Sequence, residues 1–171
     1  IPQQTKDRIF EAAKELNYRP NYVARSLGFQ RTHPLGVIVP ELSDGYSAMV
    51  LNGVEDVLSK EGFFYLTASH LHREDLLEKH PQILIERQVE GIIAVDSPIR
   101  FKPTLPCVNV SGHDEIEGVT NIILDHNKAA ELGIGHFYEL GHRKIAVIKG
   151  QSFSSHTEIR WKAIAEAARL I

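Results

Sequence analysis

Short apolar runs of strand length alternate with amphipathic helical patterns over most of this chain, and this alternation restricts the fold more than any other feature. The run "LGVIVP" at 35–40 is continuously apolar, which predicts a strand buried on both faces. Further strands are predicted at 63–69, 91–95, 105–110, 120–124 and 144–149. Helices are predicted at 47–61, 73–89, 126–140 and 157–170, and Pro81 makes the start of the second uncertain. Strands that alternate with helices predict a parallel, doubly wound α/β sheet with right-handed crossovers.

The first 33 residues follow a different pattern. Apolar residues recur at helical spacing over 5–17, and Pro20 ends this helix. A second, very short helix is predicted at 21–27, with an asparagine as its cap and Gly28 as its end. A helix of about eight residues is not stable alone in water, so this segment needs a partner to become ordered.

Charge is divided unevenly along the chain. Residues 1–33 carry six Lys or Arg against three acidic residues, whereas the remainder carries 13 against 19, which leaves a net charge of −3. A basic segment on an acidic body favours contact with a polyanion, and an ordinary solvated helix surface explains the charge equally well.

The single cysteine excludes an internal disulfide framework and suits a reducing compartment. No signal peptide or membrane-spanning run is predicted, so we expect a cytoplasmic protein with no membrane partner.

Polar residues follow several of the predicted strands, at the edge where open α/β sheets bind ligands. These segments are 41–46, 69–72, 96–97, 125–126 and 151–156. Their hydroxyls, carboxylates, amides and single aromatic side chain suit a polar, hydroxyl-rich small molecule, although such loops are common.

Catalytic and metal-binding patterns are weak in this sequence. It contains no glycine-rich phosphate loop, nucleophile elbow or dinucleotide fingerprint, so neither an enzyme nor a cofactor is predicted. A metal site at His70, His72, Glu74 and Asp75 is disfavoured, because this spacing does not place both imidazoles on one helical face. The nine histidines are therefore expected at the surface or in capping positions, and no metal is predicted.

Longer motifs identify a family resemblance. "LNYRPNYVARSL" and "ELGHRKIAVI" are highly specific, and "THPLGVIVPEL", "RQVEGIIAV" and "RWKAI" support them. Over essentially the whole chain, these motifs closely resemble the lactose-repressor/galactose-repressor (LacI/GalR) family of bacterial transcription regulators. The resemblance implies a type I periplasmic-binding-protein-like effector domain, preceded by the end of an all-α helix-turn-helix headpiece and a hinge helix. It assigns a headpiece remnant to 1–20, hinge and linker to 21–33, the N-terminal effector subdomain to 34–142 and the start of the C-terminal one to 143–171. On this basis the chain is expected to be a fragment.

The same resemblance suggests which residues contact DNA. In the family, the hinge helix becomes ordered on operator DNA beside its twin from the other subunit. Leu27 then corresponds to the wedge that opens a base step, and Ala24 permits close approach. Tyr18, Asn21 and Arg25 correspond to contacts with the DNA backbone. The alternative is a bare linker whose leucine packs on the headpiece.

The resemblance also suggests an effector site between two subdomains. Tyr46 matches an aromatic residue that stacks on the effector, and Arg160 matches an arginine that donates to effector hydroxyls or carboxylates. Asp125 matches an acid at the cleft edge, and Ser69 and Asp96 are looser candidates. Arg160 could instead form a salt bridge that closes the subdomains, and Asp125 could also be structural.

Together these features predict a homodimeric regulator, expected to be a repressor, that binds a pseudo-palindromic operator and a small effector related to carbohydrates. The helical regions 47–61 and 73–89 are the expected subunit interface. A sugar-binding protein of the periplasmic type without a DNA role is the main alternative, and an α/β enzyme is the second. The first alternative predicts an export signal and no basic helical prefix, and neither expectation fits the sequence.

Overall fold

The computed structural model describes residues 2–18, 34–150 and 154–171, and the chain divides into two compact units, Ile1–Thr32 and His33–Ile171. In the first unit, α1 (Gln3–Glu15) confirms the helix predicted at 5–17 with a small shift of its ends. None of its residues is buried, and Ile9, Phe10 and the following Leu16 are exposed. The short helix predicted at 21–27 lies outside the described residues.

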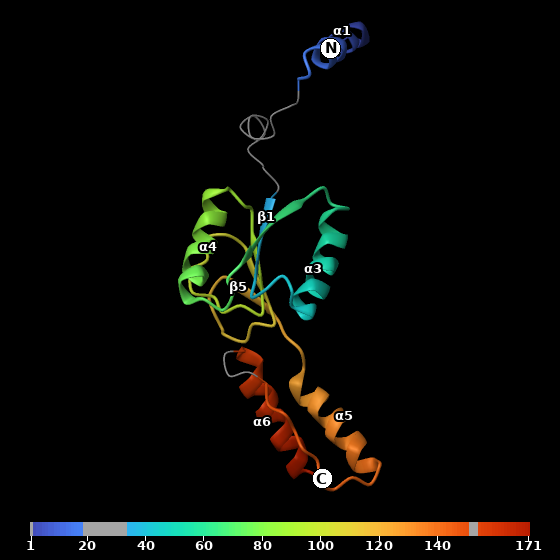
Figure 1. Cartoon of the computed structure of the whole chain (residues 1–171), viewed down its shortest axis with the longest axis vertical. Helices are drawn as coiled ribbons and strands as arrows, with labels where there is room; N and C mark the ends of the chain where they lie inside the picture. The colour runs from blue at the N-terminus through green and yellow to red at the C-terminus, as the bar shows by residue number, and fades with distance from the viewer. Residues whose placement is uncertain (1, 19–33, 151–153) are drawn as a thin grey trace. The chain divides into compact units, whose positions relative to one another are not determined.

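The second unit contains a five-stranded parallel sheet (Figure 1), which confirms the predicted fold class. The strand order is β2-β1-β3-β4-β5. The strands are β1 (Pro34–Val39), β2 (Phe64–Ser69), β3 (Ile92–Val95), β4 (Cys107–Val110) and β5 (Val119–Ile122). The helices are α3 (Gly45–Leu58), α4 (Glu74–Glu86), α5 (His126–Glu139) and α6 (Ser155–Arg169).

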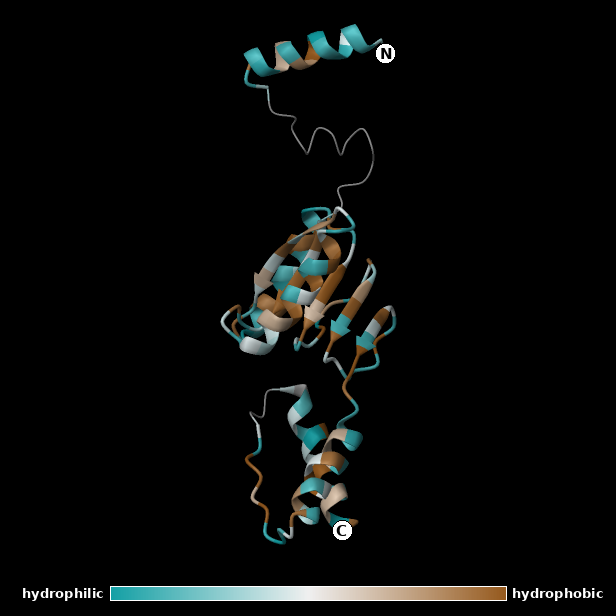
Figure 2. Ribbon diagram, turned by 90° about the vertical axis from the view of Figure 1, so that its right-hand side faces the viewer, coloured by the Kyte–Doolittle hydropathy of each residue, from teal (hydrophilic) through white to brown (hydrophobic). Residues whose placement is uncertain are grey.

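Helices α3 and α4 lie on opposite faces of the sheet, and Figure 2 shows apolar residues concentrated along the strands between them. Alternate residues of β1 face opposite sides, as the pleat of a strand requires. Val37 and Val39 belong to a cluster that includes Val50 of α3, whereas Ile38 packs in a cluster with Leu84 of α4. The apolar run that forms β1 is therefore buried on both faces, as predicted.

Helix α4 continues through Pro81, which the sequence left uncertain. A proline inside a helix removes one backbone hydrogen bond and usually destabilises the helix. Here the Pro81 ring is among the most completely buried side chains of the described chain, and this burial of apolar surface acts against that loss.

The strand predicted at 144–149 is wrong for this structure, because residues 142–150 have no regular secondary structure. Ile148 in the middle of this segment is 99% exposed. A strand requires backbone hydrogen bonds to a neighbouring strand, and no described strand pairs with these residues. An apolar run alone did not reveal whether such a partner lies beside it.

Helices α5 and α6 confirm the helices predicted at 126–140 and 157–170, and they pack against each other. Figure 2 shows the strand arrowheads pointing toward the end of the sheet at which these two helices lie. The carboxyl ends of the strands thus face the first turns of α5 and α6. Within the described part of the chain, no helix combines the length and apolar character needed to cross a membrane.

Candidate effector-binding site

A cavity of about 770 Å³ lies outside the carboxyl ends of the strands. Its volume is within the range that small-molecule sites usually have, and its position is the one at which open α/β sheets bind ligands. Loops that follow several strands contribute to it together with the first turns of α6. Its polar lining residues are Glu41, Ser43, Asp44, Tyr46, His72, Asp96, Ser111, Ser154, His156, Thr157 and Arg160.

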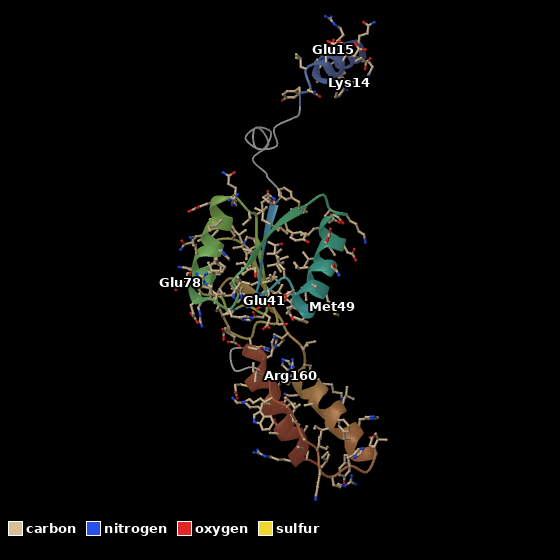
Figure 3. All side chains as sticks on the ribbon, in the orientation of Figure 1. Lys14, Glu15, Glu41, Met49, Glu78 and Arg160 are labelled. Carbon is tan, nitrogen blue, oxygen red and sulfur yellow. The ribbon has the colours of Figure 1, made fainter. Side chains whose placement is uncertain are left out.

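Three of the five predicted effector residues line this cavity. Tyr46 lies in the first turn of α3, Asp96 directly follows β3, and Arg160 comes from α6. Figure 3 labels Arg160 and also Glu41, another lining residue from the sheet edge. The Tyr46 hydroxyl forms a hydrogen bond with the Ser111 hydroxyl, which ties the start of α3 to the end of β4.

The other two predicted residues are not brought to this cavity. The Ser69 hydroxyl donates to the carbonyl oxygen of Pro40 at 2.8 Å and so links the ends of β2 and β1. Asp125 is the N-cap of α5, where its carboxylate accepts the Lys128 backbone N–H at 2.8 Å. Asp125 lines a second cavity of about 830 Å³, which lies between α5 and α6. Apart from Asp125, the residues that line this second cavity belong to α5, to α6 or to the two residues that follow α6. We therefore place the candidate site in the first cavity, which is lined by loops that follow several strands.

The carboxylates of the cavity differ in their electrostatic environment. Burial raises the pKa of Asp96, and the nearby Asp44 carboxylate raises it further, whereas His72 and Arg160 act in the opposite direction. Asp44 caps α3 and accepts both the backbone N–H and the hydroxyl of Ser47 at 2.9 Å, and these bonds lower its pKa. The site therefore offers hydrogen-bond acceptors beside the guanidinium donor of Arg160.

A buried histidine next to the cavity, His70, forms hydrogen bonds with the loops that follow β2 and β3. His70 Nδ1 accepts the His72 backbone N–H at 3.1 Å, and its Nε2 lies 3.0 Å from the Ser97 hydroxyl. The Ser97 hydroxyl donates in turn to the carbonyl oxygen of Val95 at 2.8 Å. Burial, followed by the charges of His72 and His80, lowers the pKa of His70 to about 4. Both ring nitrogens of the neutral His70 imidazole thus take part in hydrogen bonds.

Backbone strain is concentrated at the same edge. Leu71, His72, Asp96 and Ser111 all have positive φ, between 42° and 71°, although none is glycine. Residues in this region cost about 1–3 kcal/mol each and cluster at functional sites. Three of the four, all except Leu71, line the cavity.

The DNA-binding candidates fall mostly outside the structure. Tyr18 is exposed and follows α1, whereas Asn21, Ala24, Arg25 and Leu27 lie outside the described residues. The role of all five remains a prediction.

Sequence reasoning missed several residues that the fold brings to this region. Ser111 and Thr157 line the cavity without having been singled out. His113, His126 and His156 come together at its border, where their ring nitrogens lie within 4.8 Å of one another. Their separations along the chain match no metal-binding motif, and the only signals in the sequence were the number of histidines and the positions of His126 and His156 in the strand-end segments 125–126 and 151–156.

Comparison with known protein families gives a match over most of the chain. The matching model describes periplasmic binding proteins and the sugar-binding domain of the LacI family, and it covers residues 32–169. The catabolite control protein A of Staphylococcus xylosus is 29% identical over 157 residues, which are 88% of this chain and 48% of that protein. The transcriptional repressor PurR of Haemophilus influenzae is 26% identical over 176 residues, or 98% and 52% of the two chains. This chain thus spans about half the length of these relatives.

A solved structure confirms the fold. The Lac repressor dimer bound to operator and the anti-inducer ONPF superposes with a TM-score of 0.86 at 20% identity. The similarity covers 99% of this chain and 54% of that one. The periplasmic-binding-protein-like architecture predicted from the motifs is therefore present.

Proposed function

Because the chain belongs to the family of periplasmic binding proteins and LacI-type sugar-binding domains, we propose that it is part of a ligand-responsive transcription regulator. The observation that carries the proposal is the 770 Å³ cavity in which Tyr46, Asp96 and Arg160 meet. The relative from Haemophilus influenzae is named a transcriptional repressor, and the similar Lac repressor structure contains an operator and a small anti-inducer. We propose a cytoplasmic repressor with no enzymatic activity.

The chemistry of the cavity favours a small carbohydrate or a related polyhydroxylated metabolite. The Tyr46 side chain is 39% exposed at the cavity and offers an aromatic face for the apolar C–H side of a sugar ring. Arg160 supplies several fixed N–H donors for ligand oxygens. The carboxylates of Glu41 and Asp96 accept hydrogen bonds from hydroxyl groups, and that combination is what a polyol requires.

We propose that the N-terminal segment binds DNA. The uncovered apolar side chains of α1, Ile9 and Phe10, are suited to packing against further helices of a headpiece. The segment 21–27 is too short to be a stable helix alone, and pairing with its twin in a minor groove would order it. In this proposal Leu27 is the wedge, and Tyr18, Asn21, Ala24 and Arg25 surround it.

A homodimer is the assembly that this mechanism requires, and one side of α3 is suited to form it. Met49, Gly53 and Val57 are spaced four residues apart, so they share one face of the helix. Met49 is 73% exposed and Val57 is 60% exposed, and a Cβ at Gly53 would meet nothing within 4 Å. Figure 3 labels Met49 on this helix. We propose that this face contacts the same face of a second subunit.

The effector site can be tested with a panel of monosaccharides and glycosides in a thermal-shift assay, followed by calorimetric titration. A ligand that binds the folded state raises the melting temperature by mass action. Replacement of Arg160 removes charged hydrogen bonds worth about 1.5–3 kcal/mol, so Arg160→Gln should weaken affinity about 10–100-fold. Arg169→Gln, at the opposite end of α6, is the matched control and should bind normally. Equal affinity of all three proteins would place the site elsewhere.

The DNA role needs a separate measurement on the intact protein. Duplexes selected from a random pool should bind with an affinity that rises steeply as salt falls, because phosphate contacts release counterions. The effector found above should then change that affinity. Effector binding without any salt-dependent DNA binding would instead support a sugar-binding protein of the periplasmic type.

A further inference from the structure

Three histidines from three separate segments converge beside the effector cavity. His113 comes from the loop between β4 and β5, His126 is the first residue of α5, and His156 lies in the first turn of α6. His113 Nε2 lies 3.1 Å from His156 Nδ1 and 3.4 Å from His126 Nε2. His126 Nε2 and His156 Nδ1 are 3.4 Å apart, so the three nitrogens form a nearly regular triangle.

Hydrogen bonding within the triangle cannot satisfy all three nitrogens. Each imidazole nitrogen offers either one proton or one lone pair. Three such atoms can form one normal N–H···N bond among themselves, and the third atom is then left without a partner. His126 and His156 are buried and His113 is partly buried, so water has restricted access to that atom. A cation that accepts all three lone pairs removes this deficit.

The size of the triangle matches a particular class of ion. Zinc–nitrogen bonds of about 2.0–2.1 Å in a tetrahedral site place the nitrogens about 3.3–3.4 Å from each other. The observed separations of 3.1–3.4 Å are close to this edge length. The three nitrogens therefore already occupy one face of such a tetrahedron.

The surroundings prepare the imidazoles to act as ligands. His156 Nε2 lies 3.3 Å from Asp96 Oδ1, and a proton held on Nε2 by this carboxylate leaves the lone pair of Nδ1 directed at the cluster. Arg160 opposes a cation here, and the carboxylates of Asp96 and Asp125 compensate for its charge.

We propose that His113, His126 and His156 bind one Zn²⁺ ion, with Asp96 as a positioning residue. The ion would fasten the loop after β4 to the first turns of α5 and α6. Three protein ligands leave the fourth tetrahedral position for water or for an oxygen of a bound ligand. This inference depends only on the geometry of the cluster and does not require the proposed regulatory function.

The test uses the full chain, freed of metal with a chelator and then titrated with ZnCl₂ by calorimetry. We expect one zinc ion per chain, confirmed by elemental analysis after gel filtration, and a higher melting temperature. His126→Gln and His156→Gln should each weaken zinc binding at least 100-fold. His136→Gln, which alters an exposed histidine of the same helix α5, is the matched control and should bind zinc normally. Asp96→Asn should weaken zinc binding about 10-fold or more, as expected for a carboxylate that orients a ligand.

Cobalt(II) gives a second readout on the unaltered chain, which keeps the test valid if a histidine variant fails to fold. One equivalent of CoCl₂ should produce the strong visible absorption of tetrahedral cobalt, and ZnCl₂ should abolish it. A weak octahedral spectrum would overturn the proposal. Zinc binding that is not stoichiometric, or that His156→Gln and His136→Gln reduce equally, would also overturn it.

Discussion

The neutral His70 network leads to a prediction about stability in acid. A proton added to Nδ1 of His70 would point at the His72 backbone N–H, which already donates to that atom at 3.1 Å. Donor would then face donor in a site where the imidazole is only 2% exposed. Protonation should therefore occur in the unfolded chain well before it occurs in the folded one.

The size of the effect follows from the two protonation equilibria. The pKa of His70 falls from 6.5 to about 4 on folding. Because the unfolded chain binds the proton first, the free energy of unfolding decreases as the pH falls from 6.5 to about 4 and changes no further below that. This difference between the pKa values of His70 in the unfolded and the folded chain corresponds to about 3 kcal/mol in the free energy of unfolding.

The substitution His70→Gln isolates this contribution, because glutamine can keep a donor toward Ser97 and does not titrate. Urea unfolding of both proteins at half-unit steps from pH 7 to pH 4 gives the difference between their unfolding free energies. We expect that difference to move by about 3 kcal/mol in favour of the variant across this range. Contributions from distant groups cancel in the comparison. Parallel pH profiles of the two proteins would show that His70 does not oppose protonation.

Three further substitutions test other parts of the structure. Gln88→Gly should stabilise the chain by about 0.5–1 kcal/mol in urea unfolding, because φ at this helix end is 60° and glycine adopts it without strain; an unchanged midpoint would contradict this. Val57→Asp should raise the dimer dissociation constant of the intact protein at least 10-fold in analytical ultracentrifugation, since it puts a charge on the proposed subunit contact; an unchanged constant would exclude this face. Leu27→Ala should weaken operator binding by a few kcal/mol in fluorescence anisotropy, the scale of an unstacked base step, and leave effector affinity unaltered. Normal operator affinity would eliminate the wedge assignment.

The fold could be predicted because its signals are local. The uninterrupted apolar run of β1 reports burial on both faces, and Val37, Ile38 and Val39 are buried there as expected. The segment at 144–149 has a similar composition and forms no strand, since a strand also depends on a neighbour that its own residues do not encode. The local sequence pattern therefore predicted the central strand β1 correctly and the segment 144–149, which has no neighbouring strand among the described residues, incorrectly.

The site was less predictable, because it depends on where side chains point. Tyr46, Asp96 and Arg160 meet at one cavity although more than 110 residues separate the first from the last. Ser69 and Asp125 also follow predicted strands, but their side chains are engaged elsewhere. The Ser69 hydroxyl donates to a backbone carbonyl oxygen, and the Asp125 carboxylate accepts a backbone N–H at the N-terminus of α5. Polar side chains at strand ends serve both purposes, and the sequence does not distinguish them.

Asp96 joins the two proposed sites and makes their relationship testable. Its carboxylate lines the effector cavity and also lies 3.3 Å from the Nε2 of His156, whose other nitrogen belongs to the histidine triangle. A ligand hydroxyl that donates to Asp96 competes with His156 for the same carboxylate, so effector binding would then weaken zinc binding. A ligand oxygen that occupies the open position on zinc would instead make effector binding and zinc binding strengthen each other. Zinc must change effector affinity by the same factor by which effector changes zinc affinity, since coupling between two binding equilibria is reciprocal. Titration of effector with and without zinc gives the sign of this coupling, and Asp96→Asn should abolish it if the carboxylate is the connection.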